Sequence, residues 1–274
     1  MDILYLIQKE GLRRGLSQKT IKTYKQCVKQ FLNKCNKPIR KISKKDVKDY
    51  IDCLIGLGVC GNTINVHLCS LKFMLQEILG KSVMLKIRFS KTPKSLPTVL
   101  TKEEVVRIIN SIENKKHKLL IKLMYSAGLR VGEVVRLKPK DLELDKGYGW
   151  VRRGKGNKDR LFIIAKCIKY ELSEFVKDVD SNFYIFKGNK SHLSVRSVQE
   201  IVKKSVKESN VRKKVHPHTF RHSFATHLIE DCYDIAAVQF LLGHSKTDTT
   251  MIYVHMASPK MISVISPLDR LDVE

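Results

Sequence analysis

Four short segments in the second half of the chain combine side chains that stabilise or attack a phosphate group. The first, GLRVGE at 128–133, places Arg130 directly after a glycine turn and at the expected start of a helix. The planar guanidinium of an arginine is suited to bidentate contact with a phosphate. The alternative is a surface arginine paired with Glu133, three residues further on.

The second segment, HPHTFRHSFATH at 216–227, holds four histidines and an arginine, which suggests a metal site as a first interpretation. The spacing argues against it, because no cysteine or carboxylate lies among His218, His222 and His227. Aromatic and aliphatic residues instead recur at every fourth position and anchor a helix in a core: Phe220, Phe224 and Leu228.

His218 and Arg221 in this segment are three residues apart and therefore share one face of the predicted helix. They lie near its N-terminus, where the free backbone amides favour an anion. Taken alone, a histidine at such a position is more often structural than catalytic.

The third and fourth segments add a lysine, a histidine and a tyrosine. In GKGNKDR at 154–160 the glycines allow close approach to a backbone, and Lys155 at the loop tip is a long, mobile cation; Lys158 is an alternative. In LGHSKTDTTMIYVH at 242–255, His244 follows the glycine that ends a helix, and Tyr253 comes nine residues later. Each alone is more often solvated or structural.

Composition points to a polyanionic partner. The 274 residues include 52 Lys and Arg against 27 Asp and Glu, a net charge of +25, and 43% hydrophobic residues exclude a disordered chain. Residues 1–90 carry 18 basic and 6 acidic residues, and the remainder carries 34 and 21, so both halves are basic. We expect two modules that each contact the phosphates of a nucleic acid, and a lysine-rich genome is the alternative explanation of the charge.

Residues 1–87 are predicted to form a compact helical unit that binds DNA. A short helix is expected over 2–12, and three more follow caps at Ser17, Ser43 and Asn62. Residues 88–98, with two prolines among basic residues, suit a linker.

The second predicted domain covers 99–274. Thr101 and Glu104 fit a capping box, which is typical of a helix N-terminus. Further elements are predicted along this domain: helices over 116–126 and 133–137, a hairpin with strands 148–153 and 160–165, and helices from Ser194 to the end with breaks at Pro217 and Gly243.

The seven cysteines are scattered and never form CxxC, so we expect reduced thiols and no zinc site. The apolar run at the N-terminus is too short for a signal peptide, and no run has membrane-spanning length. We therefore expect a cytoplasmic, nucleoid-associated protein with no membrane contact.

In order and spacing, the four segments closely resemble the catalytic domain of the tyrosine recombinases, the phage integrase family, and most of all its Xer-type members. The resemblance implies a mainly α-helical fold: an N-terminal core-binding (SAM-like) domain and an α+β catalytic domain with a small β-hairpin or sheet, closing as a C-shaped clamp. The six positions of the family's catalytic set are filled: Arg130, Lys155, His218, Arg221, His244 and Tyr253.

The resemblance implies that Tyr253 attacks a DNA phosphodiester and forms a covalent 3′-phosphotyrosyl intermediate. A phenol with a pKa of about 10 is ionised in only about one molecule per thousand at pH 7, a deficit of about 4 kcal/mol, so we expect surrounding positive charge to lower that pKa. The arginines would clamp the phosphate oxygens, His244 would donate to them, and His218 would act as donor or base. Lys155 would protonate the leaving oxygen.

Three further residues, Glu133, His222 and His227, are interpreted as supporting or structural, with Glu133 holding Arg130. We expect no metal ion and no cofactor. By resemblance, strands exchange through a Holliday junction in a homotetramer on two duplexes, coupled by exchange of a C-terminal tail that begins at Ser258 and contains Met261, Ile262, Val264 and Ile265. Accessory proteins, the target site, and the choice among chromosome-dimer resolution, mobile-element integration or excision, and inversion are left open.

Two rival functions share part of this pattern. A type IB topoisomerase uses the same chemistry without a partner site, and recombination between two specific sites distinguishes the two. A catalytically silent DNA-binding protein with the same fold is the other rival, and the complete six-residue set argues against it.

Overall fold

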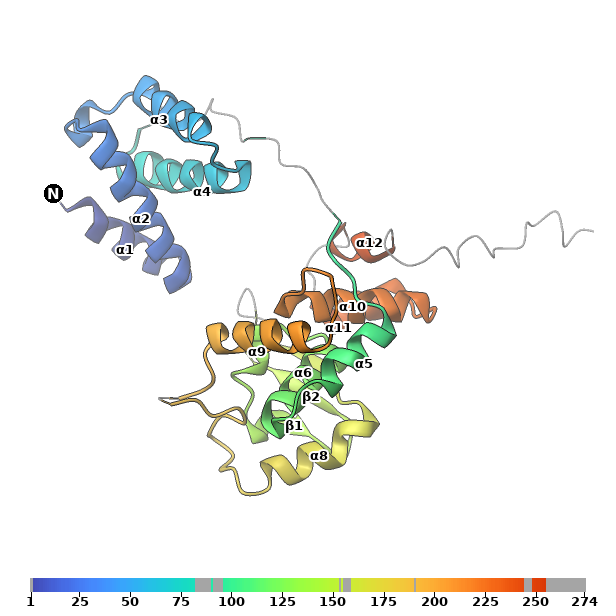
Figure 1. Cartoon of the computed structure of the whole chain (residues 1–274). Helices are drawn as coiled ribbons and strands as arrows, with labels where there is room; N and C mark the ends of the chain where they lie inside the picture. The colour runs from blue at the N-terminus through green and yellow to red at the C-terminus, as the bar shows by residue number, and fades with distance from the viewer. Residues whose placement is uncertain are drawn as a thin grey trace, which may run out of the picture. The chain divides into compact units, whose positions relative to one another are not determined.

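The computed structural model describes residues 2–81, 90, 96–152, 154, 159–189, 191–243 and 248–254, without the side chains at 248, 252 and 254. The chain divides into two compact units, Met1–Ser95 and Leu96–Glu274 (Figure 1). The division falls inside the predicted 88–98 linker, whose exact bounds stay a prediction. None of the described helices is long and apolar enough to span a membrane.

The first unit is helical throughout its described residues. Its elements in chain order are α1 (Ile3–Arg13), α2 (Gln18–Cys35), a 3-10 turn (Ile39–Lys41), α3 (Lys44–Gly56) and α4 (Gly61–Lys72), which continues into a π-helical segment (Phe73–Ile78). The predicted caps at Ser17 and Ser43 are confirmed, because each side chain accepts a hydrogen bond from a backbone amide of its helix.

The predicted cap at Asn62 is wrong. α4 begins at Gly61, after Cys60, whose backbone is extended and whose side chain makes no capping bond to the helix backbone. Asn62 is therefore the second residue of the helix, and Cys60 occupies the N-cap position. The Cys60 sulfur instead lies 3.2 Å from the Thr63 hydroxyl.

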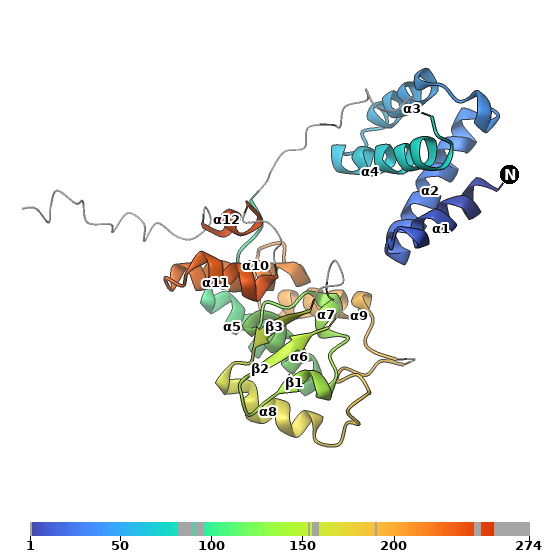
Figure 2. The same ribbon diagram turned by 180° about the vertical axis from the view of Figure 1, so that it is seen from behind.

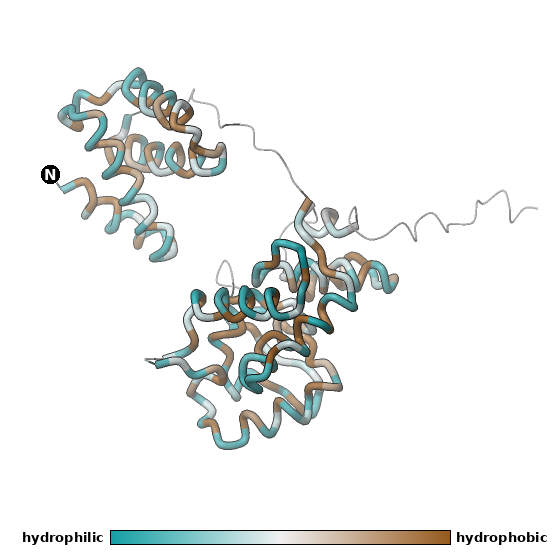
Figure 3. Tube along the Cα trace, in the orientation of Figure 1, coloured by the Kyte–Doolittle hydropathy of each residue, from teal (hydrophilic) through white to brown (hydrophobic). Residues whose placement is uncertain are grey.

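α2 lies at the centre of this unit, where it contacts α1, α3 and α4. Its apolar stripe meets theirs in a core whose fully buried members include Ile7, Val28, Phe31, Val47 and Leu71. Hydrophobic and hydrophilic positions alternate along the helices with the period of one buried face (Figure 3).

The second unit surrounds a small antiparallel sheet with helices. Its elements are α5 (Lys102–Asn110), α6 (Lys115–Ser126), α7 (Val131–Val134), a 3-10 turn (Pro139–Asp141), β1 (Leu142–Glu143), β2 (Tyr148–Val151), β3 (Arg160–Ile163), α8 (Lys166–Val176), α9 (Val195–Glu208), α10 (Pro217–Glu230), α11 (Ile235–Leu242) and α12 (Asp248–Val254). The sheet order is β1-β2-β3, and Val151 pairs with Arg160.

The structure confirms the hairpin, the Thr101 capping box and the boundaries at Pro217 and Gly243. It adds β1 and α8, which the sequence prediction lacks. β1 has only two residues and α8 buries only Ile168 and Leu172 completely, so neither carries a strong local pattern. The predicted 133–137 helix is wrong in its bounds, because α7 begins at Val131 and ends at Val134.

α10 is the element around which the predicted site is assembled. It contacts α6, α9, α11 and α12, and α11 in turn contacts β3 (Figures 1 and 2). The segments that carry the sequence motifs, separated by up to 125 residues along the chain, are thereby brought to one end of α10.

Candidate active site

Arg130 occupies the N-cap position of α7, directly after the turn at Gly128. Gly128 has φ +57°, a left-handed conformation that favours glycine. Glu133, three residues on, accepts from the Arg130 backbone amide at 2.9 Å and from its Nη1 at 2.8 Å. The side chain of Glu133 therefore fixes both the backbone and the guanidinium of Arg130, as the sequence predicts.

A second arginine, Arg160, shares the same carboxylate. Its Nη2 donates to Glu133 Oε2 at 2.6 Å and its Nη1 donates to the carbonyl of Leu241 at 2.6 Å. Arg160 is buried at the start of β3, immediately after the loop that carries Lys155. The sequence analysis missed this residue, because only the fold reveals that a strand arginine faces inward onto Glu133.

Burial opposes ionisation of Glu133, yet the charge of Arg160 and the hydrogen bonds from Arg130 outweigh it and hold the pKa of the carboxyl below its ordinary value. Glu133 is thus a carboxylate between two cations. It ties the turn at Arg130 to the strand at Arg160.

Arg221 lies on α10 and is 3% exposed. Its Nη1 donates to the carbonyl of Gly128 at 2.6 Å and its Nη2 donates to the carbonyl of Leu242 at 2.5 Å. Burial, and then the charges of Arg130 and Arg160, lower its pKa to about 9. The guanidinium therefore fastens the turn before α7 to the end of α11 and adds a third cation to the site.

His218 is the second residue of α10, one turn before Arg221. Burial lowers its pKa, and the charges of Arg221 and Arg130 lower it further. Its ring is therefore neutral at pH 7. The predicted pairing of His218 with Arg221 on one helical face is consistent with this interaction.

Tyr253 on α12 is 3% exposed and belongs to an apolar cluster with Phe224, Ala225, Val238 and Leu242. Its hydroxyl lies 3.1 Å from Nδ1 of His222, and the two ring centres are 5.7 Å apart. His222, interpreted from the sequence as supporting or structural, therefore contacts the predicted nucleophile directly.

The expectation that positive charge lowers the pKa of Tyr253 is only half right. The charges of Arg221 and Arg130 do lower it, but burial of the phenol acts more strongly in the opposite direction and the pKa is raised overall. In this state of the protein the phenol keeps its proton.

Lys155 and His244, the remaining members of the predicted set, lie outside the described residues. The structure does describe their flanks. Gly154 and Asp159 flank Lys155, and Gly243 precedes His244; a Cβ on Gly243 would lie 2.5 Å from Cδ of Arg160. The strand that follows the lysine loop and the helix end that precedes His244 are therefore in close contact.

Within the described residues no group of three or more His, Cys, Asp or Glu side chains is arranged to hold a metal ion. The histidines of the 216–227 segment make different contacts. His227 is structural, as predicted: its Nδ1 lies 2.8 Å from the Tyr125 hydroxyl and its Nε2 lies 2.9 Å from the carbonyl of Leu100.

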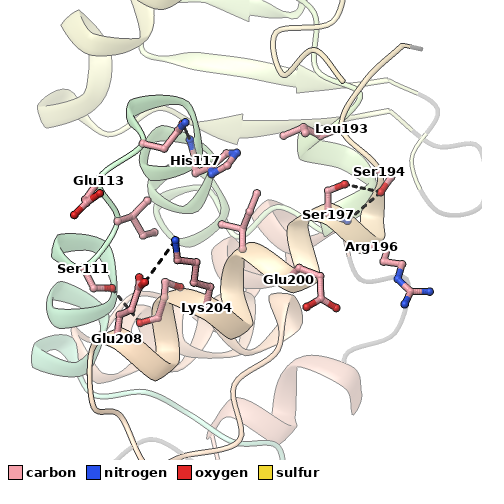
Figure 4. A pocket seen from close by; sticks show the side chains of 14 residues that line it. Ser111, Glu113, His117, Leu193, Ser194, Arg196, Ser197, Glu200, Lys204 and Glu208 are labelled. Atoms are coloured by element: carbon pink, nitrogen blue, oxygen red, sulfur yellow. Dashed lines mark hydrogen bonds and ion pairs between the residues drawn. The ribbon is translucent and has the colours of Figure 1, made fainter. Parts of the chain in front are cut away.

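A separate hollow of about 1080 Å³ lies between the ends of α5 and α6 and the length of α9 (Figure 4). Its wall mixes carboxylates and cations, including Glu113, Glu200, Glu208, Arg196 and Lys204. None of the predicted catalytic residues lines it. We therefore place the candidate active site at the end of α10.

Comparison with known proteins decides the family. The model of the phage integrase family matches residues 98–259, and the model of the phage integrase N-terminal SAM-like domain matches residues 6–84. The chain belongs to the phage integrase family. These are the tyrosine recombinases, and the first match contains every residue of the predicted catalytic set.

Individual relatives place this tyrosine recombinase among the Xer-type members. A tyrosine recombinase of Thermosipho africanus is 34% identical over 268 residues, 93% of this chain and 95% of its own length. Tyrosine recombinase XerA of Pyrococcus horikoshii is 34% identical over 256 residues, 92% of this chain and 88% of its own.

Among solved structures, XerH site-specific recombinase bound to palindromic difH substrate in a post-cleavage complex has a TM-score of 0.73 and 25% identity, with 90% of this chain and 79% of that chain covered. The λ integrase dimer bound to a core site shares the fold at a TM-score of 0.73 and 20% identity, over 92% and 93% of the two chains.

The predicted fold class and the recombinase assignment are thus confirmed. The chain is an enzyme that cleaves and rejoins DNA in site-specific recombination through a covalent intermediate.

Proposed function

We propose that this tyrosine recombinase uses Tyr253 as its nucleophile and the residues around the end of α10 as its catalytic set. The observation that carries the proposal is that α10 contacts both the turn before α7, through Arg221 and the Gly128 carbonyl, and α12. There the charges of Arg130 and Arg221 act on the Tyr253 phenol, and His222 is hydrogen-bonded to it. Two arginines beside a buried tyrosine suit attack on a phosphodiester, whose transition state gathers negative charge on its non-bridging oxygens.

In the proposed reaction a Tyr253 oxygen–phosphorus bond forms as the bond from phosphorus to the 5′ oxygen breaks, which leaves a 3′-phosphotyrosyl link. Arg130 and Arg221 bind the non-bridging oxygens, and His218 donates a hydrogen bond to them. Removing one such donor in other enzymes costs about 3 to 4 kcal/mol of transition-state stabilisation. By family resemblance His244 adds a further donor, and Lys155 protonates the departing 5′ oxygen.

We also propose that the reaction needs no metal ion. The charge that a divalent cation supplies in many phosphoryl-transfer enzymes is provided here by guanidinium groups that the fold holds in place. Arg130 is fixed by Glu133 and Arg221 by two backbone carbonyls, so neither has to reorganise when the transition state forms.

The proposed partner is double-stranded DNA at two specific sites. Residues 1–87 would form a core-binding domain, joined by residues 88–98 to a catalytic domain at 99–274, and the two would close as a C-shaped clamp. Four protomers would exchange strands through a Holliday junction, with accessory proteins as possible partners for chromosome-dimer resolution or mobile-element movement. The XerH relative bound to its difH substrate supports a DNA site of this kind.

Exchange of the C-terminal tail is proposed to couple the protomers. Residues 258–265, which lie outside the described residues, have the apolar spacing of a short helix. α11 offers an apolar surface to receive such a helix: only Val238 and Leu242 of its eight residues are buried, and Phe240 is 61% exposed. Truncation after Ala257 is expected to abolish tetramer assembly on DNA and recombination, measured by gel shift and by product formation. Unchanged assembly would contradict the proposed coupling.

A suicide substrate tests the central proposal. A duplex that carries a candidate site and a nick near the scissile phosphate traps the covalent intermediate, because the small fragment released on cleavage diffuses away. Incubation in EDTA is expected to give a protein–DNA adduct on denaturing gels, and Tyr253→Phe is expected to give none. An adduct that persists in Tyr253→Phe would remove Tyr253 from its role, and an adduct that requires added metal would overturn the metal-free chemistry.

A further inference from the structure

The hydrogen bond between His222 and Tyr253 is the starting point. Tyr253 is buried and His222 is half-buried, the donor–acceptor distance is 3.1 Å, and the bond joins α10 to α12 across 31 residues of sequence. A general base must lie within about 2.6 to 3.2 Å of the atom whose proton it removes. His222 meets this geometric condition.

Among the described residues, the two charged side chains that shift the pKa of Tyr253 have no free site for a proton. The charged groups that shift the pKa of Tyr253 are Arg221 and Arg130, and an arginine cannot accept a proton at neutral pH. His222 differs, because burial, followed by the charges of His218 and Arg221, lowers its pKa to about 4. At pH 7 its ring is neutral and one ring nitrogen has a free lone pair.

We propose that Nδ1 of His222 accepts the phenolic proton of Tyr253 as the phenol attacks phosphorus. This inference rests on the proposed function and adds a residue to it, since the resemblance assigned His222 only a supporting place. The O–H bond of Tyr253 breaks, its electron pair forms the bond to phosphorus, and the proton moves to His222. The 5′ oxygen leaves with a proton from the general acid. Rejoining runs the same steps backward and returns the proton to the phenol.

Binding of DNA changes the electrostatics in the direction that this step needs. The neighbours that disfavour a charged His222 ring in the DNA-free protein are cationic or capable of becoming so. A phosphate clamped by Arg221 and Arg130 places negative charge beside them and favours the protonated ring. The tendency of His222 to accept a proton therefore rises when substrate is bound.

α10 carries a second histidine that is paired with a tyrosine, and this pair provides a control for the His222–Tyr253 pair. His227 lies five residues after His222 and makes the same kind of bond, from Nδ1 to the hydroxyl of Tyr125 at 2.8 Å. His227 places one ring nitrogen at the Tyr125 hydroxyl on α6 and the other at the carbonyl of Leu100, so neither of these hydrogen bonds involves the predicted nucleophile. His227→Gln therefore perturbs a buried histidine–tyrosine pair on the same helix without touching the proposed proton transfer.

The experiment measures single-turnover adduct formation on the suicide substrate with the full chain. His222→Gln keeps a hydrogen-bonding side chain but removes the basic nitrogen, and His222→Asn is a smaller second variant. We expect a loss of about 10²-fold with His222→Gln, within the usual range for a general base. Thermal unfolding and DNA affinity are measured for each variant, and His227→Gln is expected to change unfolding without a comparable loss of rate.

Replacement of Tyr253 by 3,5-difluorotyrosine, through an amber codon, separates proton transfer from packing. The more acidic phenol depends less on a base. In the His222→Gln variant it is therefore expected to raise the rate of adduct formation by at least about tenfold. No restoration in either His222 variant, or restoration in His218→Gln instead, would overturn the proposal. Failure of the unaltered protein to form an adduct would count against the proposed function itself, so the two failures are distinguishable.

Discussion

At the scale of single residues, Glu133 links cations with different tasks. It binds Arg130, a proposed catalytic residue, and Arg160, which is buried between β3 and the end of α11. The sequence predicts the first contact from a three-residue spacing. The second joins residues 27 positions apart on a turn and a strand, and no local pattern contains it. Arg160 could therefore be found only from the structure.

Replacing Glu133 by glutamine is expected to cost about 3 to 5 kcal/mol of unfolding free energy, because it leaves Arg160 buried without its carboxylate. Below the unfolding temperature, cleavage should fall less than in Arg130→Ala, since Arg130 itself remains. Equal losses of cleavage would contradict this ranking.

The same pair predicts how stability depends on pH. The pKa of Glu133 is lower in the folded than in the unfolded protein, so its contribution is complete above the ordinary carboxyl pKa and is lost as the pH falls through the lower folded value. Urea unfolding between about pH 7 and pH 3 should show a steeper acid loss in the wild type than in Glu133→Gln.

At the scale of elements, the packing of the turn before α7 is tested by comparing Gly128 in that turn with Gly147, which has a similar backbone conformation but no close neighbours. Gly128 and Gly147 both have positive φ, at +57° and +76°. A Cβ on Gly128 would lie 2.5 Å from Cδ1 of Phe224, whereas a Cβ on Gly147 would meet nothing within 4 Å. The carbonyl of Gly128 also accepts from Arg221, so a shift of this turn reaches the active site.

Gly147→Ala is expected to cost about 1 to 2 kcal/mol, from the left-handed conformation alone. Gly128→Ala is expected to cost a further 1 to 3 kcal/mol or so from crowding against Phe224, and to slow adduct formation through Arg221. Denaturant unfolding of both variants measures the difference. Equal costs would show that the turn relaxes without moving α10.

The elements differ in how far the sequence predicts them. Helices with a cap and an apolar stripe, such as those that follow Ser17, Ser43 and Thr101, are predicted well because their signals are local. β1 is paired with β2, and α8 contacts α6 and buries only two residues completely, so both depend on tertiary contacts. The proposed roles of Lys155 and His244 rest on the resemblance to the tyrosine recombinases, because both residues lie outside the described residues.

At the scale of the whole molecule, positive charge is distributed unevenly over the helices of the first unit. α2 contains no acidic residue in its 18 positions, and Lys19, Lys22 and Lys29 on it are exposed. α3 also exposes lysines, but it interleaves them with Asp46, Asp49 and Asp52. α2 is therefore the better candidate to contact DNA phosphates.

Changing Lys19, Lys22 and Lys29 together to glutamine is expected to reduce the slope of log affinity against log salt by up to about 0.9 per lost phosphate contact. The control changes Lys41, Lys45 and Lys48 to glutamine, which removes the same charge from the neighbourhood of α3. Equal slopes for the two triple variants would mean that the α2 lysines are only a solvated face.

The burial of Arg221 has a consequence for the stability of the protein as a whole. Its charge is held out of water beside Arg130 and Arg160, with Glu133 as the opposing carboxylate among the groups that shift its pKa. A DNA phosphate bound by the proposed arginine pair would add negative charge beside these cations. The charges of Arg130 and Arg160 disfavour the charged form of Arg221 in the folded chain, and we expect DNA bound at this site to relieve that repulsion and to raise the unfolding temperature of the protein.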